Sequence, residues 1–277
     1  MKCEWDKLLA VLPRDIRSDV DRQGREDLQE LRVRLGRPTQ LVKAGGEVFL
    51  EHSGTADDLN YIVNTASRYS PWAAASSAQG YITAPGGHRI GLCGEVAIRD
   101  GEVTGIRTVS SLCIRVARDF PGIGKNAAKL TGNLLIAGPP GSGKTTLLRD
   151  LIRLCSNSGN GSVAVVDERE ELFPPGCCFD TGCRTDILSG CGKPAGIDMA
   201  LRTLGPKVIA MDEITSTADC DALEQALWCG VRLLATVHAA SKQDLLGRGI
   251  YSKLVRSGHF DTLIILRRDK SWSMERM

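Results

Sequence analysis

Nine consecutive residues near the middle of the chain have the types and the spacing that hold a nucleotide by its phosphates. They are Gly138-Pro139-Pro140-Gly141-Ser142-Gly143-Lys144-Thr145-Thr146, a G-x-x-x-x-G-K-T pattern between an apolar run and a Leu/Ile-rich segment. In such a loop the backbone N–H groups surround phosphate oxygens at a helix N-terminus. We therefore expect Lys144 to reach the β- and γ-phosphates and Thr145 to hold Mg²⁺. A glycine-rich turn that binds nothing would not require the full pattern in this setting.

Two acidic pairs downstream of the loop follow apolar runs, where a nucleotide hydrolase needs carboxylates. Asp212-Glu213 follows residues 209–211, and Asp167-Glu168 follows residues 163–166. Hydrolysis requires that Mg²⁺ be held from a second side and that a water be oriented. We assign Asp212 to Mg²⁺ and Glu213 to polarising the water, with helix capping as the alternative. The acids at 167, 168 and 170 are expected to face the nucleotide as a set, although one of them could cap a helix or pair with Arg169.

One histidine and two arginines are further candidates. His238 follows the apolar run 232–237, so it could sense the γ-phosphate or connect the site to a neighbouring subunit. A purely structural histidine is the alternative. Arg89 and Arg115 lie in predicted strands of the N-terminal half. Such arginines are commonly exposed or ion-paired, yet in multimeric ATPases they can reach a neighbour's γ-phosphate.

The segments that must position these residues divide into two patterns. After residue 121, apolar runs at 134–137, 162–166, 207–211, 232–237 and 262–266 alternate with helical segments after the loop and at 219–229. This alternation predicts an α/β fold with a mostly parallel sheet and helices on both faces.

The N-terminal half has a mixed pattern instead. Helices are predicted over residues 5–12, 26–35, 59–66 and 72–78, the third after a capping box at 55–58. Strands are predicted over 41–50 as a hairpin, and over 80–83, 88–96 and 111–118. Turn residues at 118–126 mark a linker. We therefore predict a smaller α+β domain over 1–120 and an α/β domain that contains the phosphate loop over 121–277.

Composition indicates an ordinary soluble protein. Hydrophobic residues make up 42% and charged residues 25%, with a net charge of +2 and only 5% aromatic residues, so there is no strong sign of nucleic-acid binding. The sequence shows neither a long apolar run nor a signal-peptide start, which predicts a cytoplasmic protein. The ten cysteines are expected to be free thiols. Zinc at Cys177, Cys178, Cys183 and Cys191 is the less favoured alternative, because their spacing includes no C-x-x-C pair.

The motifs as a series resemble those of secretion and pilus-retraction ATPases. The series comprises the phosphate loop (Walker A), residues 166–169 (Asp box), residues 200–202, residues 211–214 (Walker B) and residues 235–238 (His box). Together with residues 80–82, 86–95, 138–150 and 184–188, they resemble more closely the stage III sporulation protein AA family of endospore-forming bacteria. The resemblance extends from about residue 31 to residue 266. The chain differs from the pattern at Thr215-Ser216, where Gly-Arg is usual, and at Ala239, where glycine is usual.

This resemblance implies that residues 121–277 form a RecA-like P-loop ATPase domain. It also implies dependence on ATP and Mg²⁺ and assembly as a homo-oligomer, expected to be a hexameric ring. Its partners would be membrane proteins of the channel or secretion-like complex between mother cell and forespore, and its location the mother-cell cytoplasm. By motif, Glu168 is the first choice for activating water and Glu213 the alternative. Arg202 corresponds to the arginine before Walker B, and Arg89 and Arg115 to positions that approach a neighbour's nucleotide. A nucleotide-gated scaffold with little hydrolysis and a nucleic-acid-stimulated RecA-like ATPase remain as alternatives.

Overall fold

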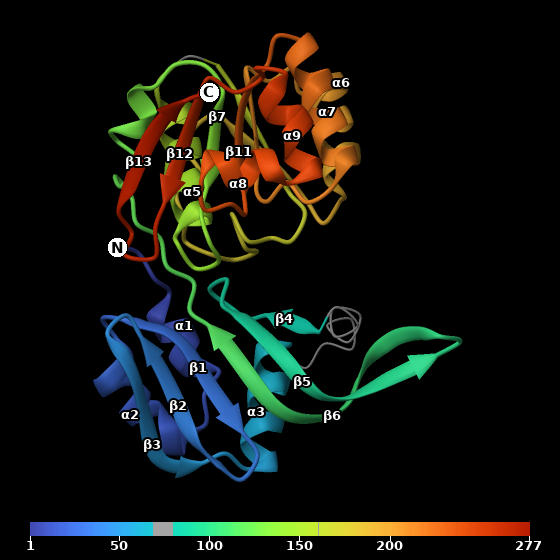
Figure 1. Ribbon diagram of the computed structural model, residues 1–277. Coiled ribbons are helices and arrows are strands. Elements are labelled where there is room, and N and C mark those ends of the chain that lie inside the picture. The colour runs from blue at the N-terminus through green and yellow to red at the C-terminus, as the bar shows by residue number, and fades with distance from the viewer. Residues whose placement is uncertain (69–79, 160) are drawn as a thin grey trace. The chain divides into compact units, whose positions relative to one another are not determined.

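The computed structural model describes residues 1–68, 80–159 and 161–277, and the chain divides into two units (Figure 1). The first unit comprises Met1–Asp119 with Pro174–Cys178, and the second comprises Phe120–Phe173 with Phe179–Met277. The helix predicted over residues 72–78 lies outside the described residues. No helix in the described part of the chain is both long and apolar enough to cross a membrane.

The first unit is built on an antiparallel sheet of six strands with the order β3-β2-β1-β6-β5-β4. Three helices contribute buried side chains to the same core as the strands. The α3 N-terminus has the predicted capping box, in which Thr55 and Asp58 bond each other's backbone N–H groups. The elements of this unit are α1 (Trp5–Ala10), α2 (Arg14–Gly24), β1 (Leu28–Arg34), β2 (Arg37–Lys43), β3 (Gly46–Ser53), α3 (Ala56–Ala66), β4 (Tyr81–Thr83), β5 (Arg89–Arg99) and β6 (Glu102–Arg115).

The prediction of a helix over residues 26–35 was wrong, because this segment forms β1. Leu28, Leu31 and Val33 are all fully buried, and the spacing of the first two suggested a helix. The pairing of β1 with β2 shifts register between Leu28 and Glu30. A bulge of this kind inserts one residue, so Leu28 and Leu31 reach the same side of the sheet despite their odd separation. The helix α2, over Arg14–Gly24, was not predicted.

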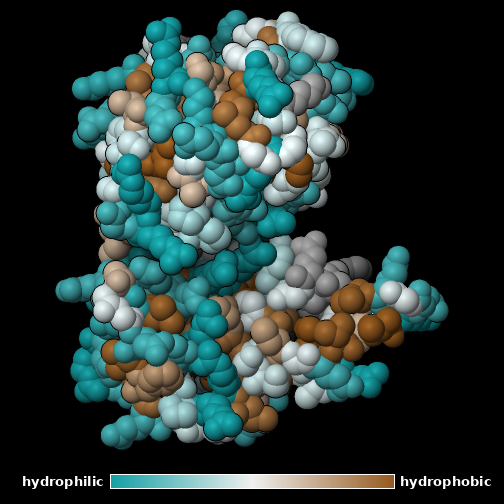
Figure 2. Space-filling view, in the orientation of Figure 1, coloured by the Kyte–Doolittle hydropathy of each residue, from teal (hydrophilic) through white to brown (hydrophobic). Residues whose placement is uncertain are grey.

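The predicted pairing of residues 80–83 with 88–96 is confirmed by β4 and β5, and β5 continues into a long hairpin with β6. In Figure 1 the end of this hairpin extends beyond the other strands of its sheet. Val96, Ile98 and Val103 on it are exposed, and Figure 2 shows apolar side chains gathered on this arm.

The second unit contains a seven-stranded sheet with the order β13-β12-β7-β11-β10-β8-β9. All neighbouring strands are parallel except β12 and β13. The five predicted strands are confirmed as β7, β8, β10, β11 and β12, whereas β9 and β13 were not predicted. The elements are η1 (Ala127–Lys129), β7 (Leu134–Ala137), α5 (Lys144–Asn157), β8 (Val163–Asp167), β9 (Thr185–Ser189), α6 (Lys193–Thr203), β10 (Val208–Met211), α7 (Thr217–Trp228), β11 (Arg232–Val237), α8 (Lys242–Gly247), α9 (Gly249–Arg256), β12 (Thr262–Leu266) and β13 (Trp272–Arg276).

Helices cover both faces of this sheet. Alternate residues of the central strands, such as Leu135, Ile209 and Leu233, share one hydrophobic core with side chains of α6, α7 and α9. Because successive strand residues point to opposite faces, the intervening residues face α5, which packs against β7, β8 and β11. The second unit therefore has the predicted α/β architecture, and the carboxyl ends of its parallel strands lie along one edge.

Candidate active site

The phosphate loop connects β7 to α5, and all nine predicted residues lie between Ala137 and the first turn of the helix. Gly141 and Gly143 have φ values of +73° and +99°, a region that favours glycine. A Cβ on Gly138 would lie 2.5 Å from Ser142 Oγ and 2.8 Å from the Leu266 carbonyl oxygen. These glycines are therefore required by the fold of the loop. Ser142 Oγ is buried and has no hydrogen-bond partner among the described residues, so its hydroxyl could donate to a phosphate oxygen.

The Lys144 ammonium lies across the loop. It donates to the carbonyl oxygens of Gly138 (2.9 Å) and Pro139 (3.1 Å) and lies 3.1 Å from His238 Nδ1. Burial lowers the pKa of Lys144, and the nearby carboxylates of Asp212 and Glu213 oppose this shift. The predicted phosphate-binding cation is thus largely shielded from solvent by the protein itself.

Asp212 follows β10 and receives hydrogen bonds from two threonines. Thr145 Oγ1 donates to Oδ2 at 2.7 Å, and Thr236 Oγ1 donates to Oδ1 at 2.5 Å. A hydroxyl and a carboxylate side by side supply the oxygen ligands that Mg²⁺ prefers. The two predicted metal ligands therefore fit the ion, and Thr145 and Asp212 would hold it.

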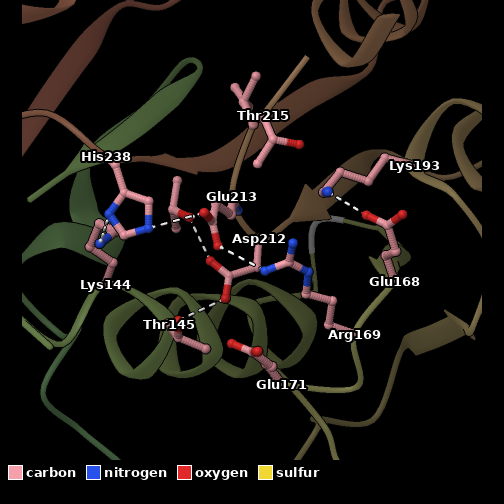
Figure 3. Close-up of polar contacts among 12 residues, drawn as sticks. Lys144, Thr145, Glu168, Arg169, Glu171, Lys193, Asp212, Glu213, Thr215 and His238 are labelled. Atoms are coloured by element: carbon pink, nitrogen blue, oxygen red, sulfur yellow. Dashed lines mark hydrogen bonds and ion pairs between the residues drawn. The ribbon is translucent and has the colours of Figure 1, made fainter. Parts of the chain in front are cut away.

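Glu213 adopts a left-handed backbone conformation with φ +54°, which costs a non-glycine residue about 1–3 kcal/mol. Its N–H donates to Thr236 Oγ1 at 2.8 Å. Its Oε1 lies 3.1 Å from His238 Nε2, and its Oε2 lies 3.7 Å from an Arg169 guanidinium nitrogen. His238 therefore bridges Lys144 and Glu213, with Nδ1 accepting from the ammonium and Nε2–H donating to the carboxylate (Figure 3).

Glu168 lies on the loop after β8 and pairs with a lysine that the sequence interpretation did not consider. Lys193 Nζ lies 2.5 Å from Glu168 Oε2, and the lysine is almost completely buried. Both residues line a cavity at the carboxyl edge of the sheet. Its lining residues are Asp167, Glu168, Arg169, Glu171, Lys193, Asp212 and Glu213.

Asp167 holds the backbone of the loop that follows it. Its carboxylate accepts hydrogen bonds from the N–H groups of Glu171 (2.9 Å), Leu172 (3.1 Å) and Phe173 (2.9 Å). Burial raises the pKa of Asp167, and these three bonds oppose the shift. Arg149 of α5 donates to the Leu172 and Glu171 carbonyl oxygens of the same loop. Asp167 and Glu168 line the cavity, whereas Glu170, the third predicted acid, is not among its lining residues.

The three predicted arginines are not among the residues that line this cavity. Arg89 and Arg115 are directly paired across β5 and β6 in the first unit. Arg89 stacks on the Tyr81 ring at 3.8 Å, and Arg115 lies 3.6 Å from Glu30. Arg202 is exposed near the end of α6, 2.9 Å from Asp198. Arg202 lies nine positions after Lys193 in this helix, about 13.5 Å along the axis.

Sequence reasoning missed three residues of the candidate site. Thr236 was treated only as part of a strand, although a buried threonine in an apolar run was a signal. Lys193 has no motif, and only the pairing of β9 with β8 brings it near Glu168. Lys270, in the turn between β12 and β13, donates a hydrogen bond to the Gly141 carbonyl oxygen. Lys270 and Gly141 are 129 residues apart in the chain, so no local pattern in the sequence predicts this contact.

Two solved structures share this architecture. The pilus retraction motor PilT with bound ADP aligns with a TM-score of 0.62 over 91% of this chain and 76% of that chain, at 16% identity. The Legionella pneumophila ATPase DotB aligns with a TM-score of 0.58 over 93% and 78%, at 17% identity. At these identities the likeness concerns the fold alone. The chain thus has a RecA-like P-loop fold preceded by a smaller α+β unit.

Sequence similarity identifies the family. Residues 2–274 match the family "Sporulation stage III, protein AA". The chain is 36% identical over 283 residues to the Stage III sporulation protein AA of Bacillus subtilis (strain 168), covering 96% of this chain and 92% of that protein. The chain belongs to the sporulation stage III protein AA family.

Proposed function

We propose that this protein is an ATP-hydrolysing motor or assembly ATPase of the secretion-ATPase type. The observation that carries the proposal is the continuous polar network at the carboxyl edge of the parallel sheet. In this network the loop lysine, Lys144, connects through His238 to Glu213. Asp212 is held beside the loop hydroxyl of Thr145. A phosphate-binding cation, a metal site and a carboxylate are therefore joined within one unit.

The proposed chemistry uses each of these groups in one role. ATP would be bound by the phosphate loop, and Lys144 would exchange its loop carbonyls and His238 for β- and γ-phosphate oxygens. Thr145 and Asp212 would hold Mg²⁺, which would neutralise part of the phosphate charge. A water attacks the γ-phosphorus, its proton passes to Glu168, and the bond to the β,γ-bridging oxygen breaks to release ADP. Glu213 is the alternative acceptor of that proton.

The proposal also covers the oligomeric state of the protein and its location in the cell. Arg202, at the exposed end of α6, and the paired Arg89 and Arg115 of the first unit would act on a neighbouring chain's nucleotide in a homo-oligomeric, hexameric ring. PilT is described as a retraction motor, and the B. subtilis relative as a sporulation protein. By this likeness, the ring would work in the mother-cell cytoplasm on membrane proteins of the complex between mother cell and forespore.

Phosphate release by the purified full chain tests the proposal when it is measured with Mg²⁺ and ATP over a range of protein concentrations. We expect turnover that rises with concentration and is lost in Lys144→Ala. Arg248→Met, which removes an exposed ion pair with Asp244, is the control and should keep full activity. ATP binding without phosphate release at any concentration would favour a nucleotide-gated scaffold. Strong stimulation of phosphate release by nucleic acid would favour a nucleic-acid-stimulated RecA-like ATPase. Either result would overturn the proposal.

A further inference from the structure

Lys193 occupies an unusual position for a lysine. It is 4% exposed and begins α6, after Gly192 at the N-cap and before Pro194. Its ammonium lies 2.5 Å from Glu168 Oε2, at the opposite side of the cavity from the phosphate loop network (Figure 3). The Lys193 contact leaves Glu168 Oε1 without a partner among the described residues.

Two physical costs oppose this arrangement. An ammonium loses hydration when it is buried, and a cation at a helix N-terminus meets the positive end of the helix dipole. The ion pair returns little net stability in exchange, because the Glu168 side chain is 39% exposed and solvent screens the attraction. The pair is therefore poorly explained as a stabilising contact, and costs of this kind are typical of functional positions.

The structure holds Lys193 in place through the sheet rather than through the helix alone. β9 pairs in parallel with β8, and this pairing sets Ser189 opposite Asp167. The short connection from β9 to α6 then places Lys193 beside Glu168, the residue that follows Asp167. Gly192 also lies close, because a Cβ there would be 4.0 Å from Glu168 Oε1. Lys193 thus contacts Glu168 at the carboxyl edge of the parallel sheet, where the nucleotide would bind.

We propose that Lys193 is a positioning residue for ATP hydrolysis, one that fixes the Glu168 carboxylate so that its free oxygen accepts the proton of the attacking water. This inference rests on the function proposed above. By occupying Oε2, the ammonium removes the rotational freedom of the carboxylate and leaves Oε1 for the water. General bases must be held within hydrogen-bond reach of the proton that they accept. Lys193 itself contacts neither the nucleotide nor Mg²⁺ in this scheme.

The experiment compares Lys193→Met, Lys193→Arg and Glu168→Gln, each alone, and Lys193→Met combined with Glu168→Gln, in the full chain. Steady-state phosphate release gives kcat and KM, and fluorescent ATP binding gives Kd. We expect Lys193→Met to lower kcat about 10- to 100-fold, because a misplacement of about 1 Å in a reacting group can cost about 100-fold, with KM and Kd changed less than about twofold. Lys193→Arg should recover part of kcat. In the Glu168→Gln background, Lys193→Met should have almost no further effect.

Each other outcome overturns the inference in a recognisable way. A large rise in Kd or KM for Lys193→Met would mean that the lysine contacts the nucleotide directly. If the two substitutions lower kcat independently in the double variant, so that their effects multiply, Lys193 does not act through Glu168. Unchanged kcat in Lys193→Met, with normal turnover in the unmodified protein, would sink this inference while leaving the proposed ATPase intact. Absent turnover in the unmodified protein would instead refute the proposed function. Thermal unfolding identifies any variant that fails to fold, and Lys193→Arg then carries the test.

Discussion

Replacing Thr236 by valine removes one buried hydroxyl and keeps the shape of the side chain. Thr236 is fully buried in β11. Its hydroxyl donates to Asp212 Oδ1 and accepts from the Glu213 N–H. The change therefore removes a hydrogen bond to a carboxylate and leaves a backbone donor without its partner, at a residue that already has a left-handed backbone.

The magnitude follows from these two contacts. A hydrogen bond to a charged group contributes about 1.5–3 kcal/mol, and an unsatisfied buried donor costs about 1–3 kcal/mol. Asp212 retains its bond from Thr145, and the two losses share one hydroxyl. We therefore expect the free energy of unfolding to fall by about 2–4 kcal/mol, which lowers the Tm by about 4–16 °C for a unit of this size.

Calorimetry and phosphate release test this expectation together. Because the hydroxyl orients the proposed metal ligand, kcat should fall about 10- to 100-fold, with partial recovery at high Mg²⁺. Thr104→Val is the matched control, since Thr104 is also in a strand but is exposed, with its hydroxyl 3.2 Å from the Ala97 carbonyl oxygen. A Tm within 1 °C of the unmodified protein, or an equal loss in the control, would refute the assignment of Thr236 as the support of Asp212 and Glu213.

Three further predictions concern other parts of the chain. His88 is buried, and burial lowers its pKa below 6.5; the stability of the first unit should therefore be full above about pH 6.5 and fall below it, by at most about 1.4 kcal/mol per pH unit in urea titrations. Asp150 accepts hydrogen bonds from the N–H groups of Gly122 and Gly124, so Asp150→Asn should lower the free energy of unfolding by about 2–4 kcal/mol in calorimetry. Gly138→Ala should weaken ATP binding at least about tenfold, because its Cβ would meet the Leu266 backbone.

Contrary results are equally specific. For His88, the sign follows from geometry: Nδ1 accepts from the Ala117 N–H, so a second ring proton would break that contact. Stability that stays constant between pH 7 and 5.5 would contradict this account. An Asp150→Asn variant as stable as the unmodified protein would show that the carboxylate does not anchor residues 122–124. For the loop, Gly247→Ala is the control, since a Cβ there meets no atom within 4 Å. Equal ATP affinity in the two glycine variants would contradict the steric argument.

The strands and the phosphate loop of the second unit were predictable because their signals are local. A buried parallel strand is a short, continuous apolar run, and five such runs were placed correctly. The edge strand β9 was not predicted, because it is only partly buried and does not form a continuous apolar run. The prediction for the β1 segment was wrong for a different reason. Its bulge depends on pairing with β2, and the apolar residues around the bulge have a spacing that is typical of a helix.

The sequence by itself determined the chemistry available to this protein: a phosphate loop, two acidic pairs after strands, and a histidine after another strand. Motif spacing carries that information because parallel strands end at a common edge. Only the tertiary structure decided how these groups are paired. It joined His238 to both Lys144 and Glu213, placed Thr236 beneath Asp212, gave Asp167 a role in holding the following loop, and brought Lys193 to Glu168. These contacts link residues far apart in the chain, and strand order and register, which no local pattern encodes, bring them together.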